Sequence, residues 1–163
     1  MPDLSVKQPV LLTCSRKLSR YEYLPMLLSG EVQYVAPQTT ESEGEAVLAW
    51  GYKPSARKAQ RLAERLALPL LRLEDGFIHS LGQGVLGAAS WSLVVDHTGI
   101  YYDATAPSDL ETLLAQDPQG LLNDPVLLQR AERLIAAITT IRSPNITMHL
   151  WILLILICPP GAR

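Results

Sequence analysis

One stretch near the middle of the chain constrains the fold most, because two kinds of apolar pattern alternate in it. AVLAWG (46–51) is a short apolar run that stops at a glycine, as is typical of a strand buried on both faces. KPSARKAQRLAERLAL (53–68) then repeats alanine and leucine at helical spacing, with Pro54 or Ser55 near the start of the predicted helix. LPLLRLED (68–75) is a second apolar run. Strand, helix and strand in this order predict a βαβ unit with a right-handed crossover in a parallel sheet.

The residues before this unit predict two further strands with a helix between them. PVLLTCS (9–15) has the apolar run of a buried strand, and EVQYVAP (31–37) alternates enough to be a second strand. RYEYLPMLLSG (20–30) is expected to form a short helix that ends at Gly30. Pro25 must then lie in the first turn of that helix, where its missing N–H costs little.

A hairpin is expected after the βαβ unit. WSLVVD (91–96) and IYYDA (100–104) are β-rich runs separated by HTG (97–99), which has the composition of a turn. Tyr101 and Tyr102 should alternate faces in the second strand, so that one packs and the other is exposed. Together the patterns predict an α/β fold, in which a parallel sheet is accompanied by a hairpin.

Two helices are predicted toward the end of the chain. PSDLETLLAQ (107–116) begins with Ser108 as N-cap and has a glutamate three residues later, which is the pattern of a capping box. DPVLLQRAERLIAAITTI (124–141) begins with Asp124 as N-cap and has proline at its first helical position.

Length and composition limit the classes of function. A chain of 163 residues fits one domain, and 48% hydrophobic with 18% charged residues is typical of a globular protein. The net charge of −2, with no basic block, argues against nucleic acid as a partner. The sequence has no HExxH, no zinc-ligand cluster and no CxxC, so neither a metal nor a cofactor is expected. Polar residues interrupt the N-terminus before any secretory signal could form, which predicts a cytoplasmic protein.

Polar residues follow the predicted strands, at the edge where ligands bind in open α/β sheets. They form three groups, at residues 51–55, 74–80 and 96–97. The helix that begins near Ser55 points its free N–H groups toward this edge, where Lys53 could help it to hold a carboxylate or phosphate. Any βα turn offers this arrangement, and Ser55 as a plain N-cap is the favoured alternative.

Glu74 and Asp75 carry the sharpest chemical hypothesis. A carboxylate at a strand end, partly desolvated by the sheet, can have a raised pKa and act as a general acid or base. The alternative is that Asp75 and Gly76 form a turn and that Glu74 caps a following helix. Spacing alone favours this alternative. Asp96 and Asp103 could likewise be paired acids that flank the hairpin, although acids at strand ends are more often turn residues.

His79 and the glycines that follow it stay ambiguous. Near Glu74 the imidazole of His79 could carry protons or bind an anion, whereas a lone histidine is usually a surface or hydrogen-bonded residue. Gly82, Gly84 and Gly87 indicate a loop without the phosphate-loop pattern GxxxxGK[ST].

Three stretches resemble one known family. VLAWGYKPSARKAQRLAERLALPLLRLEDGFIHSLGQGV (47–85), SLVVDHTGIYYDAT (92–105) and PSDLETLL (107–114) are similar to capsule polysaccharide biosynthesis and export proteins of the KpsC/LipA type. The usual patterns there are W-G-x-K/R-P-S, R-L-E-D-G-F-x-R-S and P-L-S-L-V-V-D-D-x-G-I-Y-Y-D-A. The resemblance covers about residues 46 to 135, in order and with family-like spacing.

The resemblance implies a bacterial glycosyltransferase with two Rossmann-like lobes facing a cleft, a GT-B-like fold of which residues 1–138 would form the N-terminal lobe. The family transfers 3-deoxy-manno-octulosonic acid (Kdo) from CMP-Kdo, with retention, to a lipid-linked Kdo acceptor. The product anchors the capsule and is needed for export, so capsule export components are implied partners, and peripheral contact with the inner face of the membrane is implied as well. An acidic sugar of this kind suits a site with Lys or Arg for its carboxylate and an acid as catalyst.

Matched motif by motif, Glu74 and Asp75 correspond to the acidic pair of the family and are expected to be catalytic. The Trp50–Ser55 segment corresponds to its W-G-x-K-P-S motif, and the segment from Asp96 to Asp103 to its Y-Y-D motif. The residues expected to bind substrate are Lys53, Ser55, His79, Ser80, Asp96, Tyr102 and Asp103.

The chain also departs from the family pattern. His79 replaces an arginine, so a titratable group stands where a permanently charged bidentate donor is usual, and His97 replaces the second aspartate of the hairpin motif. After Ile138 the pattern dissolves, and the family's V-V-D-Q-T strand with its catalytic aspartate, and its CMP-binding second lobe with a His-Pro motif, have no counterpart.

A frameshift or truncated reading frame would explain residues 139–163, which contain an apolar run from Leu150 to Cys158 that is too short to cross a bilayer as a helix. We therefore expect an inactive N-terminal lobe. A non-catalytic module that binds a glycan or an export partner, and a membrane-associated remnant, are the alternatives.

Overall fold

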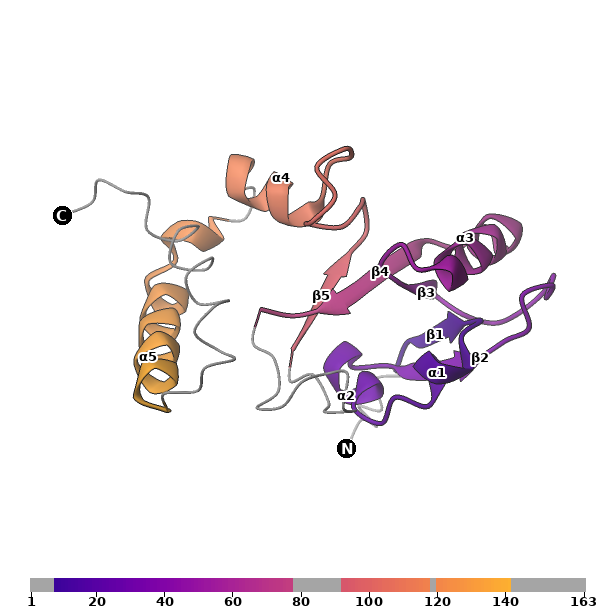
Figure 1. The fold of residues 1–163 in the computed structure, drawn as a ribbon, viewed down its shortest axis with the longest axis horizontal. Helices are drawn as coiled ribbons and strands as arrows, with labels where there is room; N and C mark the ends of the chain where they lie inside the picture. Colours follow the sequence, from indigo (N-terminus) through magenta and orange to yellow (C-terminus); the bar gives the residue numbers. More distant parts are fainter. Residues whose placement is uncertain (1–7, 78–91, 118–119, 142–163) are drawn as a thin grey trace, which may run out of the picture.

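The computed structural model describes residues 8–77, 92–117 and 120–141. Its centre is a five-stranded sheet in the order β2-β1-β3-β4-β5 (Figure 1). The first four strands run parallel, and β5 is antiparallel to β4. The strands are β1 (Val10–Thr13), β2 (Glu31–Tyr34), β3 (Ala46–Trp50), β4 (Leu70–Asp75) and β5 (Leu93–Asp96). The expected parallel α/β sheet is thus confirmed.

Helices cover both faces of the sheet. The helical elements are α1 (Arg16–Ser19), α2 (Leu24–Leu28), α3 (Pro54–Leu66), α4 (Asp109–Gln116), the 3₁₀ turn η2 (Leu121–Asn123) and α5 (Pro125–Ile141). Buried side chains of α3 belong to one core cluster, whereas buried side chains of α1 and α2 belong to a second cluster. The sheet lies between these two clusters, which is the layered arrangement of a doubly wound fold.

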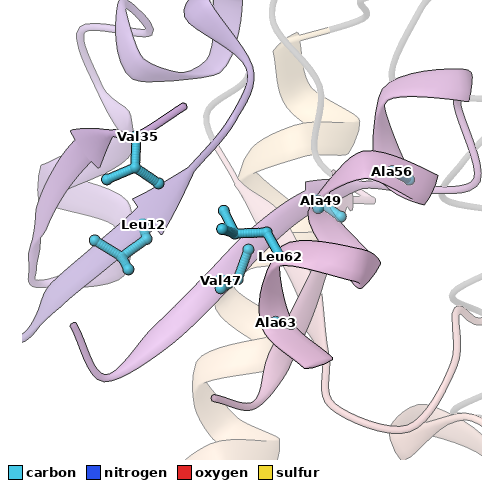
Figure 2. Packing of buried hydrophobic residues seen from close by; sticks show 8 residues of the cluster. Leu12, Val35, Val47, Ala49, Ala56, Leu62 and Ala63 are labelled. Carbon is cyan, nitrogen blue, oxygen red and sulfur yellow. The ribbon is translucent and has the colours of Figure 1, made fainter. Parts of the chain in front are cut away.

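The βαβ unit forms as its apolar pattern predicts. Leu62 of α3 is fully buried over β1 and β3, where it meets Leu12 and Val47 (Figure 2). The small side chains of Ala59 and Ala63 let the helix approach the strands closely. Burial of a leucine of this kind contributes about 2 kcal/mol, so this helical stripe is a main source of the stability of the fold.

The start of α3 differs from the expected N-cap. Lys53 has the extended backbone of an N-cap residue, Pro54 occupies the first position and Ser55 lies within the first turn. No side-chain hydrogen bond caps this end of the helix. Ser55 as a plain N-cap is therefore wrong, because proline is favoured at the first helical position and shifts the cap to the residue before it.

The caps of the later helices are confirmed. The Ser108 hydroxyl accepts a hydrogen bond from the backbone N–H of Glu111 at 3.1 Å. The Asp124 carboxylate accepts hydrogen bonds from the N–H groups of Val126 and Leu127 at 2.7 and 3.1 Å.

The hairpin over residues 91–104 is wrong. The strand β5 pairs with β4, with Leu93 opposite Asp75 and Asp96 opposite Arg72, whereas residues 100–104 form turns. The physical reason is Asp96, whose carboxylate binds the next N–H groups of the chain and turns it away from a returning strand. As a result Tyr101 and Tyr102 do not alternate faces, and both are exposed.

The helix α5 stands apart from the sheet (Figure 1). Several of its apolar side chains are exposed, among them Val126, Leu127, Leu128 and Leu134. Within residues 8–77, 92–117 and 120–141, no helix has the length and apolar character to cross a membrane. The apolar run from Leu150 to Cys158 lies outside the described residues.

Candidate functional site

The carboxyl ends of β1, β3 and β4 meet at one edge of the sheet. The strand order reverses between β1 and β3, since the chain moves outward to β2 on one side and to β4 on the other. Ligands of open α/β sheets bind at such a point. Here Gly51, directly after β3, donates its N–H to the carbonyl of Leu73 in β4 at 2.8 Å, which joins the two predicted segments.

Glu74 lies at the centre of a hydrogen-bonded group at this edge. Its Oε1 accepts from the indole Nε1 of Trp50 at 2.8 Å and from the N–H of Asp75 at 3.4 Å. The hydroxyl of Tyr102 lies near the same carboxylate, since both groups would contact a Cβ placed at Gly51. Asp75 is the last residue of β4 rather than part of a turn, and among the described residues Glu74 caps no helix. The turn at Asp75 is therefore wrong, and the residues that would form a helix capped by Glu74, from 78 on, lie outside the described residues.

A short loop, residues 50–53, is held against Glu74 and is called the Gly51 loop below. Gly51 has φ +45°, a left-handed conformation that favours glycine. A Cβ at this position would overlap the Tyr102 hydroxyl and lie 2.8 Å from Glu74 Oε2. A larger side chain would have to displace these two groups, so glycine suits this position by its backbone conformation and by its size.

Two cations flank the Gly51 loop. Arg72 donates from Nη1 to the carbonyl of Gly51 at 3.2 Å, and its guanidinium lies 4.5 Å from the centre of the Tyr52 ring. The ammonium of Lys53 lies 5.4 Å from the centre of the Trp50 ring. Such contacts restrict the orientation of both cations. Arg72 and Tyr52 were not predicted from the sequence, although Arg72 and Glu74, two apart in a strand, could have indicated a shared face.

Four aromatic rings, three of them exposed and that of Phe77 half-buried, form a continuous group beside the acids. Tyr52 and Tyr102 are 6.4 Å apart between ring centres, Tyr101 and Tyr102 are 5.5 Å apart, and Phe77 and Tyr101 are 5.1 Å apart. These residues come from three segments of the chain. Their proximity follows from the sheet and could not be predicted from local patterns.

The three tyrosine hydroxyls stay protonated near neutral pH. Burial raises the pKa of Tyr102, and the neighbouring Glu74 raises it further. Burial, Glu74 and Asp75 raise the pKa of Tyr101. Burial also raises the pKa of Tyr52, against a lowering effect of Arg72. Each phenol is therefore a hydrogen-bond donor in this site rather than a base.

Asp96 is placed differently from the expectation that it ends a strand at this edge. Because β5 is antiparallel, its carboxyl end points away from the ends of β3 and β4. Asp96 is 1% exposed, and its carboxylate accepts from the N–H groups of Thr98, Gly99 and Asp109 at 2.9, 2.7 and 3.2 Å. These contacts fix the turn that leads to Tyr102.

The remaining predicted residues fall into three groups. Hydrogen bonds from Thr105 lower the pKa of Asp103, and the Asp103 carboxylate helps to raise the pKa of Tyr52. Lys53 and Ser55 lie at the start of α3, beside the Gly51 loop. His79 and Ser80 lie outside the described residues.

No group of three metal-ligating side chains capable of holding an ion occurs in the part of the chain that the structure describes. A separate exposed pair, His97 Nδ1 and Asp109 Oδ2 at 2.8 Å, lies at the start of α4.

Comparison of the chain with known protein families identifies the family to which it belongs. The family described as "Capsule polysaccharide biosynthesis protein" matches residues 45–149. The chain belongs to this family. The Gly51 loop, Glu74, Asp75 and Asp103 all lie within the match.

Named relatives agree with this assignment. The chain is 51% identical over 72 residues to the capsule polysaccharide modification protein LipA of Neisseria meningitidis serogroup B, covering 44% of the chain and 10% of the relative. It is 39% identical over 95 residues to the lipopolysaccharide-processing protein LpsZ of Rhizobium meliloti, covering 58% of the chain and 21% of that protein.

Solved structures show where the fold belongs. The β-Kdo 2,4 transferase of Thermosulfurimonas dismutans KpsC matches 80% of the chain with a TM-score of 0.61 and 40% identity. The β-Kdo 2,7 transferase of the same KpsC matches 79% of the chain with a TM-score of 0.50 and 28% identity. The chain spans 39% and 42% of those two structures, so it corresponds to a Rossmann-like lobe within them.

Proposed function

We propose that the chain forms one lobe of a glycosyltransferase that adds Kdo during capsule biosynthesis. The observation that carries the proposal is the match to the KpsC β-Kdo 2,4 transferase over 80% of the chain. The local chemistry supports it, because an acidic pair, a lysine and several phenol donors gather at the ligand-binding edge of the sheet.

The proposed reaction moves Kdo from CMP-Kdo to a lipid-linked Kdo acceptor with retention of configuration. The bond between the anomeric carbon and the CMP phosphate breaks, a bond to an acceptor hydroxyl oxygen forms, and CMP leaves while the hydroxyl proton is taken up by a base. The acidic pair Glu74 and Asp75 is the part of this lobe that would supply acid–base chemistry. The proposed substrate-binding residues are Lys53, Ser55, His79, Ser80, Asp96, Tyr102 and Asp103.

The isolated chain is proposed to be inactive. It spans 39% of the KpsC structure and 10% of LipA. An enzyme that transfers a sugar must hold the donor and the acceptor next to each other in a reactive orientation. In the proposal the second lobe holds the donor. The chain would act on the cytoplasmic side of the inner membrane. There it would contact the membrane surface peripherally and lie near the capsule export components.

Two measurements test the proposed function. The first incubates the chain with CMP-Kdo and a lipid-linked Kdo acceptor and measures CMP release. We expect none, and turnover by the chain alone would contradict the proposed inactivity.

The second measurement titrates the chain with a Kdo disaccharide and follows backbone NMR shifts. Saturable shifts are expected at the Gly51 loop and at Tyr102. Lys53→Ala should weaken this binding, whereas Lys58→Ala, an exposed lysine on the same helix, should not. Shifts that do not saturate, or that are the same in both variants, would contradict a Kdo site at this edge.

A further inference from the structure

We propose that Arg16 and Tyr34 form a second anion subsite at the ligand-binding edge of the sheet. This subsite takes an anionic group of the acceptor other than the carboxylate of the reacting sugar, which is either the carboxylate of the next sugar or the phosphate of the lipid. The inference rests on the proposed function and adds a binding site to it. Both residues lie before the stretch 45–149 that matches the capsule family.

The first step of the argument is that the cations of this edge have no carboxylate partner. Arg16 follows β1, Lys53 follows β3, and Arg72 of β4 reaches the Gly51 loop. Among the described residues the single ion pair lies elsewhere, at the start of α4. Residues 78–91, which continue the chain after β4, contain no aspartate or glutamate. The positive charge of this edge is therefore available to an anionic ligand.

The second step is that Arg16 is held by an aromatic ring. Its guanidinium lies 5.1 Å from the centre of the Tyr34 ring, and both side chains are exposed. A ring restricts the orientation of a guanidinium but, unlike a carboxylate, does not occupy its N–H groups. The planar guanidinium can then bind a carboxylate or a phosphate through two parallel hydrogen bonds. Arg16 is thus oriented and still able to bind an anion.

The third step is that this pair lies beside the Gly51 loop without being part of it. Tyr34 is the last residue of β2, and β2 is separated from β3 by β1 alone. Two strand spacings correspond to about 10 Å. Lys53 is held separately, with its ammonium 5.4 Å from the centre of the Trp50 ring. Because each cation lies on its own ring, Arg16 and Lys53 are placed to bind two different anionic groups.

The segment that carries Arg16 also packs against the Gly51 loop. Tyr21 follows α1 directly, and its ring centre lies 6.4 Å from that of Trp50. Both rings pack against the core cluster that contains Leu18 of α1. These contacts fix α1 relative to the loop, so a ligand at the loop can extend along the same edge toward Arg16.

Binding of three Kdo ligands by the full chain tests the subsite. The methyl glycoside of Kdo has one anionic group, the Kdo disaccharide has two carboxylates, and Kdo linked to glycerol phosphate has one carboxylate and one phosphate. Backbone NMR shifts give the dissociation constants. We expect at least one ligand with two anionic groups to bind about five- to tenfold more tightly than the glycoside. The ligand with this advantage identifies the source of the second anion.

Substitutions then locate the second contact. Arg16→Gln should abolish the advantage and change the affinity for the methyl glycoside by less than about twofold. Lys17→Gln is the matched control, since Lys17 is exposed, lies next to Arg16 in α1 and carries the same charge. It should leave all three affinities within about twofold. An equal loss in both variants would reveal a general charge effect and overturn the proposal.

The outcomes also separate the subsite from the proposed function. If wild type binds all three ligands with equal affinity, the proposed function stands and the subsite is wrong. If no Kdo ligand binds, the proposed function fails, and a galacturonic acid disaccharide, which has two carboxylates, decides the subsite. Binding of this disaccharide that is lost in Arg16→Gln supports an acidic-glycan subsite, and absence of binding overturns it.

Discussion

Replacing Gly51 with alanine is the most direct perturbation of the candidate site. Gly51 has φ +45°, and a Cβ there would meet Glu74 Oε2 at 2.8 Å as well as the Tyr102 hydroxyl. Gly120 offers a matched control, since it has φ +66° and a Cβ there would have no neighbour within 4 Å. Both substitutions create the same kind of backbone strain, but only one displaces the acid and the phenol.

The expected magnitudes follow from these geometries. A left-handed conformation costs a non-glycine residue about 1–2 kcal/mol. Alanine also lowers the conformational entropy of the unfolded chain, which stabilises the folded state by about 0.4–1 kcal/mol. Gly120→Ala should therefore lower the free energy of unfolding by about 1 kcal/mol. Gly51→Ala also displaces the Glu74 carboxylate, which disturbs its hydrogen bond from the Trp50 indole and adds about 1–3 kcal/mol.

Urea denaturation followed by circular dichroism measures the difference. With a dependence of about 1–3 kcal/mol per molar urea, Gly51→Ala should move the midpoint about 1–2 M lower, and Gly120→Ala about 0.5 M lower. Equal shifts in the two variants would refute the reasoning, because the close approach of Glu74 and Tyr102 would then contribute nothing.

Three further predictions concern the elements around the site. Asp96→Asn should lower the free energy of unfolding by about 2–4 kcal/mol in urea denaturation, because the side-chain NH₂ of asparagine would face a backbone N–H that now donates to the carboxylate. A decrease below about 0.5 kcal/mol would contradict this role. Leu62→Ala should cost about 2–5 kcal/mol in the same assay, against little change for the exposed Leu134→Ala. Partial burial raises the pKa of Asp109, but hydrogen bonds from Thr98 and His97 outweigh it and lower that pKa overall. Its stabilising contribution should be present above the ordinary carboxyl pKa and disappear between about pH 5 and pH 2, so Asp109→Asn should flatten this part of the pH–stability curve, and an unchanged curve would contradict the assignment.

The parts of the fold that could be predicted from the sequence are those whose signal is local and periodic. The stripe of Ala59, Leu62 and Ala63 predicts the buried face of α3, and the structure confirms it. The caps Ser108 and Asp124 are likewise read from residues that lie within a few positions of the groups they bind. Such patterns need no knowledge of the rest of the chain.

The prediction of a hairpin was wrong because two local signals competed. The β-rich run IYYDA favours a strand, but Asp96 accepts two N–H groups of the following turn, and β4 offers β5 a partner with four residue pairs in register. Pairing with β4 buries Leu93 and Val95 against the core, which a free hairpin would not do. Tertiary burial therefore decided the pairing.

The site shows the same division between local and non-local information. The hydrogen bond between Trp50 and Glu74 joins residues 24 positions apart, and the hydrogen bond between Arg72 and Gly51 joins residues 21 positions apart. The family motifs mark Gly51, Glu74 and Asp75 as a set, yet give no partner for any of them. Only the alignment of β3 beside β4, with Trp50 opposite Leu73, brings the loop and the acids together.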